Sequence, residues 1–217
     1  MNPVYHVGWL VSRAVFRLYF HWRVLHPERV SEEGPVILAS NHASYLDPPL
    51  VGAGLSREVC FLARESLFRY RGIDALLRNW NAVPVDREGG GARGLRAIFE
   101  KLKEGHAILL FPEGTRSQDG SLQAARSGIG LTVIKSSAPV VPVRTFGTFE
   151  AFGRKHRFPR PLPVAVKYGQ PMRFEALRRE AATCGKERLK QIYQQVSGEL
   201  MSAIAKIEPC VDKTTFP

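Results

Sequence analysis

Short apolar runs, each followed by a stretch with helical periodicity, constrain the fold of this chain more than any other feature of its sequence. The run at 107–111 is continuously apolar, as are strands buried on both faces of a parallel sheet. Similar runs occur at 36–40, 58–62, 81–85, 138–143 and 164–168. Helical stretches lie at 48–54, 65–78, 95–102, 125–136 and 186–207. This alternation predicts an α/β fold with a largely parallel central sheet flanked by helices.

The N-terminal segment, residues 1–30, is expected to be an amphipathic helical unit in front of an α/β domain at 31–217. Trp9, Phe16 and Phe20 recur at helical spacing. Basic side chains lie on another side of the same helix: His6, Arg13, Arg17 and His21. A cationic, aromatic helix of this kind can lie in the headgroup region of a bilayer. It can equally pack its aromatic face against the domain, and the sequence is compatible with both placements.

The net charge of +11 over 217 residues predicts an anionic partner, which can be nucleic acid, an anionic membrane leaflet or a phosphorylated substrate. Three cysteines without close spacing argue against a disulfide framework and a zinc site: Cys60, Cys184 and Cys210. No apolar run approaches the roughly 20 residues of a membrane-spanning helix, and no signal peptide is recognisable. We therefore expect a cytoplasmic protein, peripheral on the inner face of the cell membrane, without a metal or an organic cofactor.

The loop at 41–47, Asn-His-Ala-Ser-Tyr-Leu-Asp, follows the first of these buried strands. Asp47 can cap the helix that begins at Pro48. A loop that curls into a helix start can fold Asp47 back onto His42, which would fix the imidazole tautomer and leave the other ring nitrogen to take a proton. Taken alone, however, such a pair is more often an ordinary polar contact at the surface.

A second polar loop, at 112–117, follows the apolar run at 107–111. Gly114 allows a positive φ and the close approach of a ligand to the backbone. Arg116 and Arg87 can each grip phosphate oxygens in a forked geometry, and Glu113 can orient an arginine or bind a hydroxyl. Both loops are predicted to lie at the carboxyl ends of strands, where sites gather in α/β sheets.

Together the two loops resemble the glycerolipid acyltransferase family, whose members esterify glycerol 3-phosphate and lysophosphatidic acid. Residues 41–47 are similar to the family's first block, His-x-x-x-x-Asp, and 111–117, Phe-Pro-Glu-Gly-Thr-Arg-Ser, match its third block. Residues 83–87 and 138–143 are similar to the second and fourth blocks. Arg64 and Arg126-Ser127 depart from the pattern, because the family commonly carries lysine there. The resemblance runs from about 35 to 171.

The resemblance implies acyl transfer without a covalent acyl-enzyme. His42 would deprotonate the free hydroxyl of 1-acyl-sn-glycerol 3-phosphate, and Asp47 would hold His42 in register. The phosphate and glycerol end would be bound by Arg87, Glu113, Gly114, Thr115 and Arg116. The donor would be acyl-CoA or acyl-carrier protein, and the product phosphatidic acid. A lyso-ornithine lipid or another lysophospholipid is the alternative acceptor.

Three other functions were weighed. Residues 89–94 fit the Gly-x-Gly-x-x-Gly pattern of dinucleotide-binding folds, with Glu113 near the spacing of a ribose-binding acid. However, 86–88 separate the glycines from the preceding strand, and this hypothesis leaves the loop at 41–47 unused. The basic run at 154–157 lacks any recognised nucleic-acid motif, so we expect no nucleic-acid partner. Ser44 lies outside any Gly-x-Ser-x-Gly elbow, which argues against a serine hydrolase.

Overall fold

The computed structural model describes residues 2–85 and 92–209. In this part of the chain, seven strands form one sheet in the order β1-β7-β6-β2-β5-β3-β4. The strands are β1 (Arg23–Leu25), β2 (Val36–Ser40), β3 (Val59–Arg64), β4 (Ala82–Val85), β5 (Ala107–Leu110), β6 (Val140–Phe146) and β7 (Ala165–Tyr168). Every neighbouring pair is parallel except β6 and β7. The predicted α/β fold with a largely parallel sheet is therefore confirmed.

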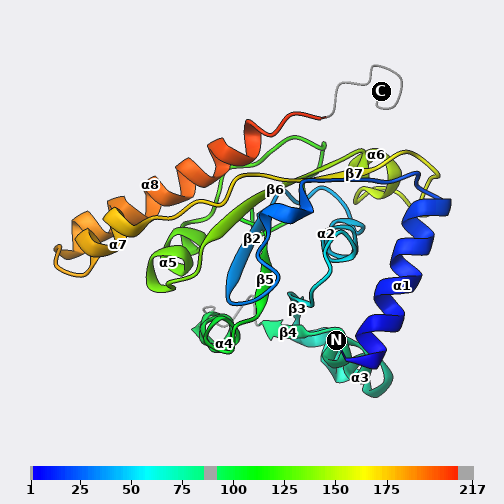
Figure 1. Cartoon of the computed structure of the whole chain (residues 1–217), viewed down its shortest axis with the longest axis horizontal. Helices are drawn as coiled ribbons and strands as arrows, with labels where there is room; N and C mark the ends of the chain where they lie inside the picture. Colours follow the sequence, from blue (N-terminus) through cyan, green and yellow to red (C-terminus); the bar gives the residue numbers. More distant parts are fainter. Residues whose placement is uncertain (1, 86–91, 210–217) are drawn as a thin grey trace.

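Helices cover both faces of this sheet (Figure 1). They are α1 (Pro3–Leu18), α2 (Asp47–Ala53), α3 (Arg71–Asn79), α4 (Ala92–Lys103), α5 (Ser127–Lys135), α6 (Thr148–Phe152), α7 (Glu175–Ala181) and α8 (Lys186–Ala205). Two short 3-10 helices, η1 (Pro27–Arg29) and η2 (Glu65–Arg69), lie between strands. Figure 1 places α4, α5 and α8 on one side of β2 and β5, and α1 and α2 on the other.

Alternation along the central strands supplies a core on each face, because successive strand residues point to opposite sides. Leu38 and Leu109 pack with side chains of α1 and α2, whereas Ile37 and Ile108 pack with side chains of α4, α5 and α8. Residues 36–40 are buried throughout. Burial on both faces explains why these strands are continuously apolar in the sequence.

The sequence analysis placed the main elements correctly but missed several short ones. β1, α6 and α7 were not predicted. The helical stretch expected at 65–78 is divided into η2 and α3, which are separated at Tyr70 by an extended backbone. Short edge strands and single-turn helices carry too few residues for periodicity to reveal them.

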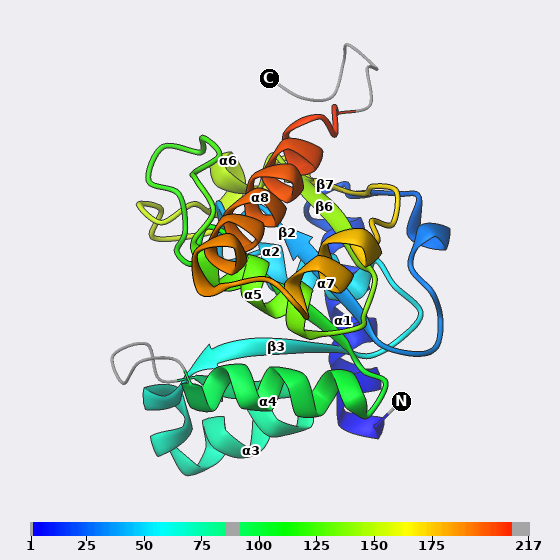
Figure 2. The ribbon, with the colours of Figure 1, turned by 90° about the vertical axis from the view of Figure 1, so that its left-hand side faces the viewer.

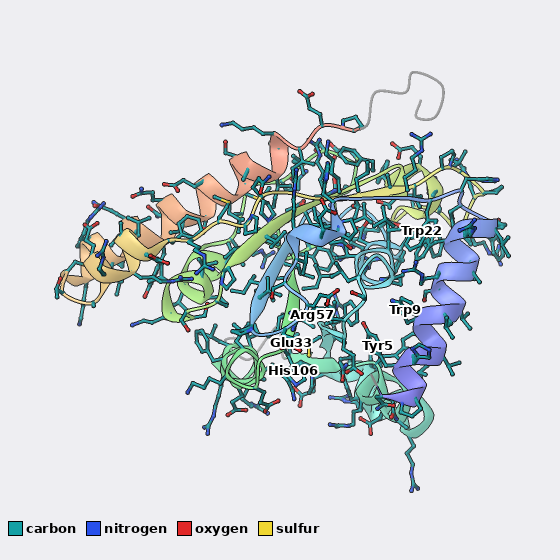
Figure 3. All side chains as sticks on the ribbon, viewed as in Figure 1. Tyr5, Trp9, Trp22, Glu33, Arg57 and His106 are labelled. Carbon is teal, nitrogen blue, oxygen red and sulfur yellow. The ribbon has the colours of Figure 1, made fainter. Side chains whose placement is uncertain are left out.

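The N-terminal helix α1 packs its aromatic side against the domain. Phe16 and Phe20 are buried in the core beneath α2. Trp9 Nε1 donates to the carbonyl of Leu55 at 2.8 Å, and the Tyr5 hydroxyl accepts from the N–H of Val59 at 3.0 Å. Figure 3 shows Tyr5 and Trp9 on the side of α1 that faces the domain. Among the described helices, none combines the length and apolarity needed to cross a bilayer.

Candidate active site

The loops that follow β2 and β5 meet at the carboxyl end of the sheet. β2 and β5 are adjacent and parallel, with Val36 opposite Ala107. The backbone N–H of His42 donates to Glu113 Oε1 at 2.9 Å, and the N–H of Ser117 donates to the carbonyl of His42 at 2.7 Å. The structure therefore brings together the two loops that the sequence singled out.

His42 and Asp47 are in direct contact in this site. His42 Nδ1 lies 3.0 Å from Asp47 Oδ2, and the two side chains are 13% and 0% exposed. The same oxygen accepts the backbone N–H groups of Ala43 and Ser44, each at 2.7 Å, and Oδ1 accepts the Thr145 hydroxyl at 3.0 Å. Because an ionised carboxylate only accepts, Nδ1 carries the proton and Nε2 keeps its lone pair.

Local chain geometry explains how a spacing of five residues closes this pair. α2 begins at Asp47, its N-cap is Leu46, and no side chain caps it. The expectation that Asp47 caps the helix is thus wrong, because its carboxylate turns back to the loop that precedes it. Pro48 lies in the first helical turn, where its missing N–H costs no hydrogen bond.

A third strand, β6, supports the same carboxylate from the other side of β2. The backbone N–H of Thr145 donates to Asn41 Oδ1 at 2.8 Å, and Asn41 Nδ2 donates to the carbonyl of Thr145 at 3.3 Å. Both residues are buried. Because the N–H and the carbonyl of Thr145 are both bonded to the side chain of Asn41, the Thr145 hydroxyl is held facing Asp47.

The imidazole of His42 rests on the ring of Phe111, the first residue after β5. The two rings are stacked, with centroids 3.8 Å apart and planes at 16°. In the described part of the chain, Nε2 makes no hydrogen bond. The ring is therefore fixed through Nδ1 and one face, and its other nitrogen is left available to a ligand.

Glu113 is buried and holds the two loops together. Besides His42, its carboxylate accepts the backbone N–H of Gln123 at 3.2 Å. Burial raises the pKa of the Glu113 carboxyl, and the two backbone N–H groups oppose that rise. Sequence reasoning expected Glu113 to orient an arginine or bind a hydroxyl, whereas its oxygens here receive backbone N–H groups. Glu113 is also the acid that the dinucleotide hypothesis would assign to a ribose.

Gly114 and Arg116 form the other half of the site. Gly114 has φ +68°, a backbone conformation that favours glycine, and the side chain of Arg126 passes close above it. The guanidinium of Arg116 lies 3.5 Å above the ring centroid of Tyr45. Its Nη1 is buried, with no hydrogen-bond partner in the described residues. A buried guanidinium N–H without an acceptor is costly, so this position suits an anionic ligand.

The remaining predicted site residues are placed as follows. Thr115 is exposed at the tip of the loop, beside Arg116. Arg87 lies outside the described residues, as do Gly89, Gly90 and Gly91 of the glycine-rich motif. Ser44 is fully buried, and its hydroxyl donates to the carbonyl of Phe152 at 2.7 Å. That hydroxyl is engaged in holding the loop, which agrees with the rejection of a serine nucleophile.

The sequence profile of the family described as Acyltransferase matches residues 21–145, which is more than half of the chain. The chain belongs to this acyltransferase family. The resemblance stated from the residues at 41–47 and 111–117 is thereby confirmed.

Curated relatives and a solved structure agree with this membership in the acyltransferase family. A 1-acyl-sn-glycerol-3-phosphate acyltransferase of Bacillus subtilis is 28% identical over 121 residues, or 55% of this chain and 60% of that protein. The human 1-acyl-sn-glycerol-3-phosphate acyltransferase beta is 28% identical over 67% of this chain and 53% of its own length. These alignments thus span less than two thirds of either relative.

The solved structure is that of the 1-acyl-sn-glycerophosphate (LPA) acyltransferase of Thermotoga maritima. It matches with a TM-score of 0.72 at 25% identity, covering 94% of this chain and 81% of that one. The acyltransferase fold therefore extends over nearly the whole chain, well beyond residues 21–145.

An apolar cavity of about 370 Å³ adjoins the acyltransferase site. Its walls come from α1, α2, β3 and α3, and include Trp9, Phe61, Leu77 and Trp80. Phe111 and Tyr45 also line it. Since Phe111 stacks on His42 and Tyr45 on Arg116, the cavity begins where the two halves of the site meet.

Sequence reasoning missed three side chains of this acyltransferase site. Thr145 lies just beyond the strand expected at 138–143, and a polar residue at the carboxyl end of that strand was a usable signal. Tyr45 and Phe111 lie inside the recognised motifs, but their stacking on Arg116 and His42 is a pairwise contact. No spacing in one sequence reveals such a contact.

Proposed function

We propose that this chain transfers a fatty acyl group from an acyl thioester, acyl-CoA or acyl-carrier protein, to the free hydroxyl of 1-acyl-sn-glycerol 3-phosphate, giving phosphatidic acid. One observation carries the proposal. An imidazole held at Nδ1 by Asp47 leaves Nε2 unengaged, in a loop bonded to the one that carries the unpartnered guanidinium of Arg116. The names of the relatives in this family support the same reaction.

In this mechanism His42 Nε2 takes the proton of the acceptor hydroxyl as its oxygen attacks the thioester carbonyl carbon. The C–S bond then breaks, His42 returns the proton to the leaving sulfur, and the donor leaves as a thiol. Asp47 stabilises the imidazolium that forms between these steps. A positioned base contributes roughly 10²–10⁴-fold. Alignment of the hydroxyl and the thioester can supply up to about 7–11 kcal/mol more.

The acceptor phosphate is assigned to Arg116, with the backbone of Gly114 and the hydroxyl of Thr115 close enough along the loop to share it. Arg87 joins them in this proposal. Glu113 acts in this proposal by holding the two loops together, since its two oxygens accept the N–H groups of His42 and Gln123. Arginine suits this task because its planar fork matches phosphate oxygens.

The apolar cavity is proposed to hold an acyl chain. Its lining is mostly aromatic and aliphatic, which suits a hydrocarbon chain. Burial of each methylene of a fatty chain contributes about 0.8 kcal/mol. A chain seated there would leave its ester or thioester end near Phe111, directly beside the imidazole.

The segment 1–30 is proposed to bind the anionic inner face of the cell membrane through α1. With the aromatic side of α1 packed inward, an outward row of aliphatic side chains is exposed: Val4, Val7, Leu10, Val11, Val15 and Leu18. Helix α1 contains no acidic residue, and Arg17 is exposed in its last turn, whereas Arg13 is turned to the domain, where its Nη1 donates to the carbonyl of Ala53 at 3.0 Å. Apolar burial and attraction to anionic lipid act together in such interfacial helices.

In the decisive experiment, the purified protein is incubated with a labelled acyl donor, acyl-CoA or acyl-carrier protein, and with each lysolipid of a panel in turn. We expect labelled phosphatidic acid from lysophosphatidic acid, and a loss of turnover of about 10²-fold or more in His42→Ala. Near-normal turnover in a folded His42→Ala protein would refute the mechanism. Preferred acylation of a lyso-ornithine lipid or another lysophospholipid would keep the mechanism and change the acceptor. Micromolar binding of NAD or NADP would favour the dinucleotide hypothesis.

A further inference from the structure

Helix α3 and the 3-10 helix η2 before it expose an unusual number of apolar side chains. No residue of either element is buried. Five large apolar side chains, here called the α3 face, are 38–65% exposed: Leu67, Tyr70, Ile73, Leu76 and Trp80. In a helix, positions 73, 76 and 80 lie on one side. An exposed apolar row of this length requires a partner.

The charges around the α3 face are predominantly basic. Between residues 64 and 80 there are four arginines, Arg64, Arg69, Arg71 and Arg78, against two acids, Glu65 and Asp74. Arg78 pairs with Asp74 at 2.7 Å on the polar side of α3. Exposed arginines bordering an apolar row are complementary to a surface that is apolar inside and anionic at its boundary. A bilayer with anionic headgroups has that composition.

The α3 face also adjoins the outward row of α1. Asn2 Nδ2 donates to Asn79 Oδ1 at 3.2 Å, and Trp80 packs against Gly8, where an added Cβ would lie 2.6 Å from Nε1 of the indole. Both helices line the apolar cavity beside His42. Figures 1 and 2 place α3 at the periphery of the molecule, at the end of the sheet near β3 and β4.

We propose that the α3 face is a second membrane-binding element, which enters the interface of an anionic bilayer beside α1. The protein then binds the bilayer through two helices, and the cavity between them opens toward the lipid. This deepens the proposed function, on which it rests for the lipid substrate. A second copy of this chain is the competing occupant of the face, and it is distinguished by the oligomeric state in the absence of lipid.

The test compares two single variants of the full chain that add the same negative charge to the same helix. Ile73→Glu places it on the α3 face, at a side chain that is 44% exposed. Ala75→Glu places it on an exposed position of the opposite side of α3. Both keep α1, His42 and the cavity lining unchanged.

Co-sedimentation is measured with vesicles of phosphatidylcholine alone and of phosphatidylcholine mixed with phosphatidylglycerol. We expect the face variant to bind the anionic vesicles at least about tenfold more weakly than the control variant. Equal binding by the two variants would overturn the proposal, as would a dimer in solution that only the face variant breaks. Leu76→Glu replaces Ile73→Glu as the face variant if the change at 73 lowers the thermal midpoint.

Turnover separates this inference from the proposed function. With a short-chain, monodisperse lysophosphatidic acid, both variants should match the unmodified protein, while only the face variant should lose activity on lipid presented in vesicles. Absence of acyl transfer by the unmodified protein, with vesicle binding still dependent on the α3 face, would refute the function and leave the membrane element standing.

Discussion

Two arginines at opposite ends of the sheet show how differently this molecule uses the same side chain. Arg57, at the amino ends of the strands, donates to the carbonyls of Ser31, Gly34 and Gly105 at 2.7, 2.8 and 3.0 Å. Arg116, at the carboxyl ends, has a buried Nη1 with no partner in the described residues. Figure 3 marks Arg57 below the centre of the sheet.

The different hydrogen bonding of the two arginines indicates that Arg57 serves stability and that Arg116 serves ligand binding. The carbonyls that Arg57 binds belong to the loops before β2 and β5, so it fixes the chain where these strands begin. Arg116 lies beyond the end of β5 and is held by the ring of Tyr45, with its donors unspent. Arg57 also has one buried nitrogen, Nε, without a partner in the described residues, but its Nη1 and Nη2 make three hydrogen bonds to backbone carbonyls, and those bonds contribute to folding. A guanidinium whose hydrogen bonds are unmade in the free protein contributes when a ligand arrives.

The largest expected effect is at the carboxyl ends, in Asp47→Asn. The amide oxygen can still accept Ala43, Ser44 and the imidazole, while the Thr145 hydroxyl turns to Asn41 Oδ1, 3.3 Å away. The fold should therefore survive, but the imidazolium loses its counter-charge. We expect kcat to fall by about 10²–10⁴-fold, measured with saturating acceptor and checked by circular dichroism. A fall below threefold would show that the carboxylate charge does not serve the reaction.

Arg116→Ala should raise the KM for the lysolipid by about 10–100-fold, because the charge-assisted bonds to a phosphate are worth about 1.5–3 kcal/mol. Steady-state kinetics at varied acceptor concentration measure this change. The thermal midpoint should fall less than in Arg57→Ala, since the variant loses the stack on Tyr45 and leaves no backbone carbonyl without its donor. A loss of stability without a change in KM would make Arg116 a structural residue like Arg57.

Arg57→Ala is the reciprocal experiment. Removal of the guanidinium leaves three loop carbonyls without their donor, so we expect the free energy of unfolding to fall by about 2–3 kcal/mol. Urea denaturation measures it, and Arg57→Lys is the matched variant that keeps the charge but loses the fork. At temperatures where the variant is folded, kcat and KM should match those of the unmodified protein. Altered kinetics there would end the contrast between the two arginines.

The smallest effect is the pH dependence contributed by Glu113. Burial raises the pKa of its carboxyl in the folded protein, so the neutral form favours folding. That contribution is present below the ordinary pKa, about 4.3, and is lost as pH rises through the higher folded value. Relative to Glu113→Gln, the unmodified protein should therefore lose stability between pH 4 and neutrality. Urea titrations of both proteins across this range test the sign, and an unmodified protein that gains stability relative to Glu113→Gln as pH rises would contradict it.

The sheet and the two loops of the site could be predicted from the sequence for a physical reason. Strands buried on both faces must be apolar along their length, so 36–40 and 107–111 were visible, and parallel neighbours place their carboxyl ends together. The stacks of His42 on Phe111 and of Arg116 on Tyr45 depend on which loops meet in space. The hydrogen bond from Thr145 to Asp47 depends on the strand order, which places β6 next to β2. Local sequence does not encode that order. The boundary at residue 30 stays a prediction.

The outward row of α1 shows a different kind of failure. Val4, Val7, Val11 and Leu18 recur at helical spacing as plainly as Trp9, Phe16 and Phe20 do. The aromatic row is the one that packs inward in the structure. Where a helix is apolar on two sides, periodicity identifies both rows but not which of them meets the domain.

The stack of Phe111 on His42 ties two properties of the protein to a single ring. One surface of this phenyl group supports the imidazole, and the same side chain is part of the cavity wall. A smaller residue at 111 would deepen the cavity and at the same moment loosen the base. In the proposed function, the choice of acyl-chain length is thus coupled to the position of the base, and variants that change chain length alone are expected farther along the cavity wall, at Phe61 or Leu77.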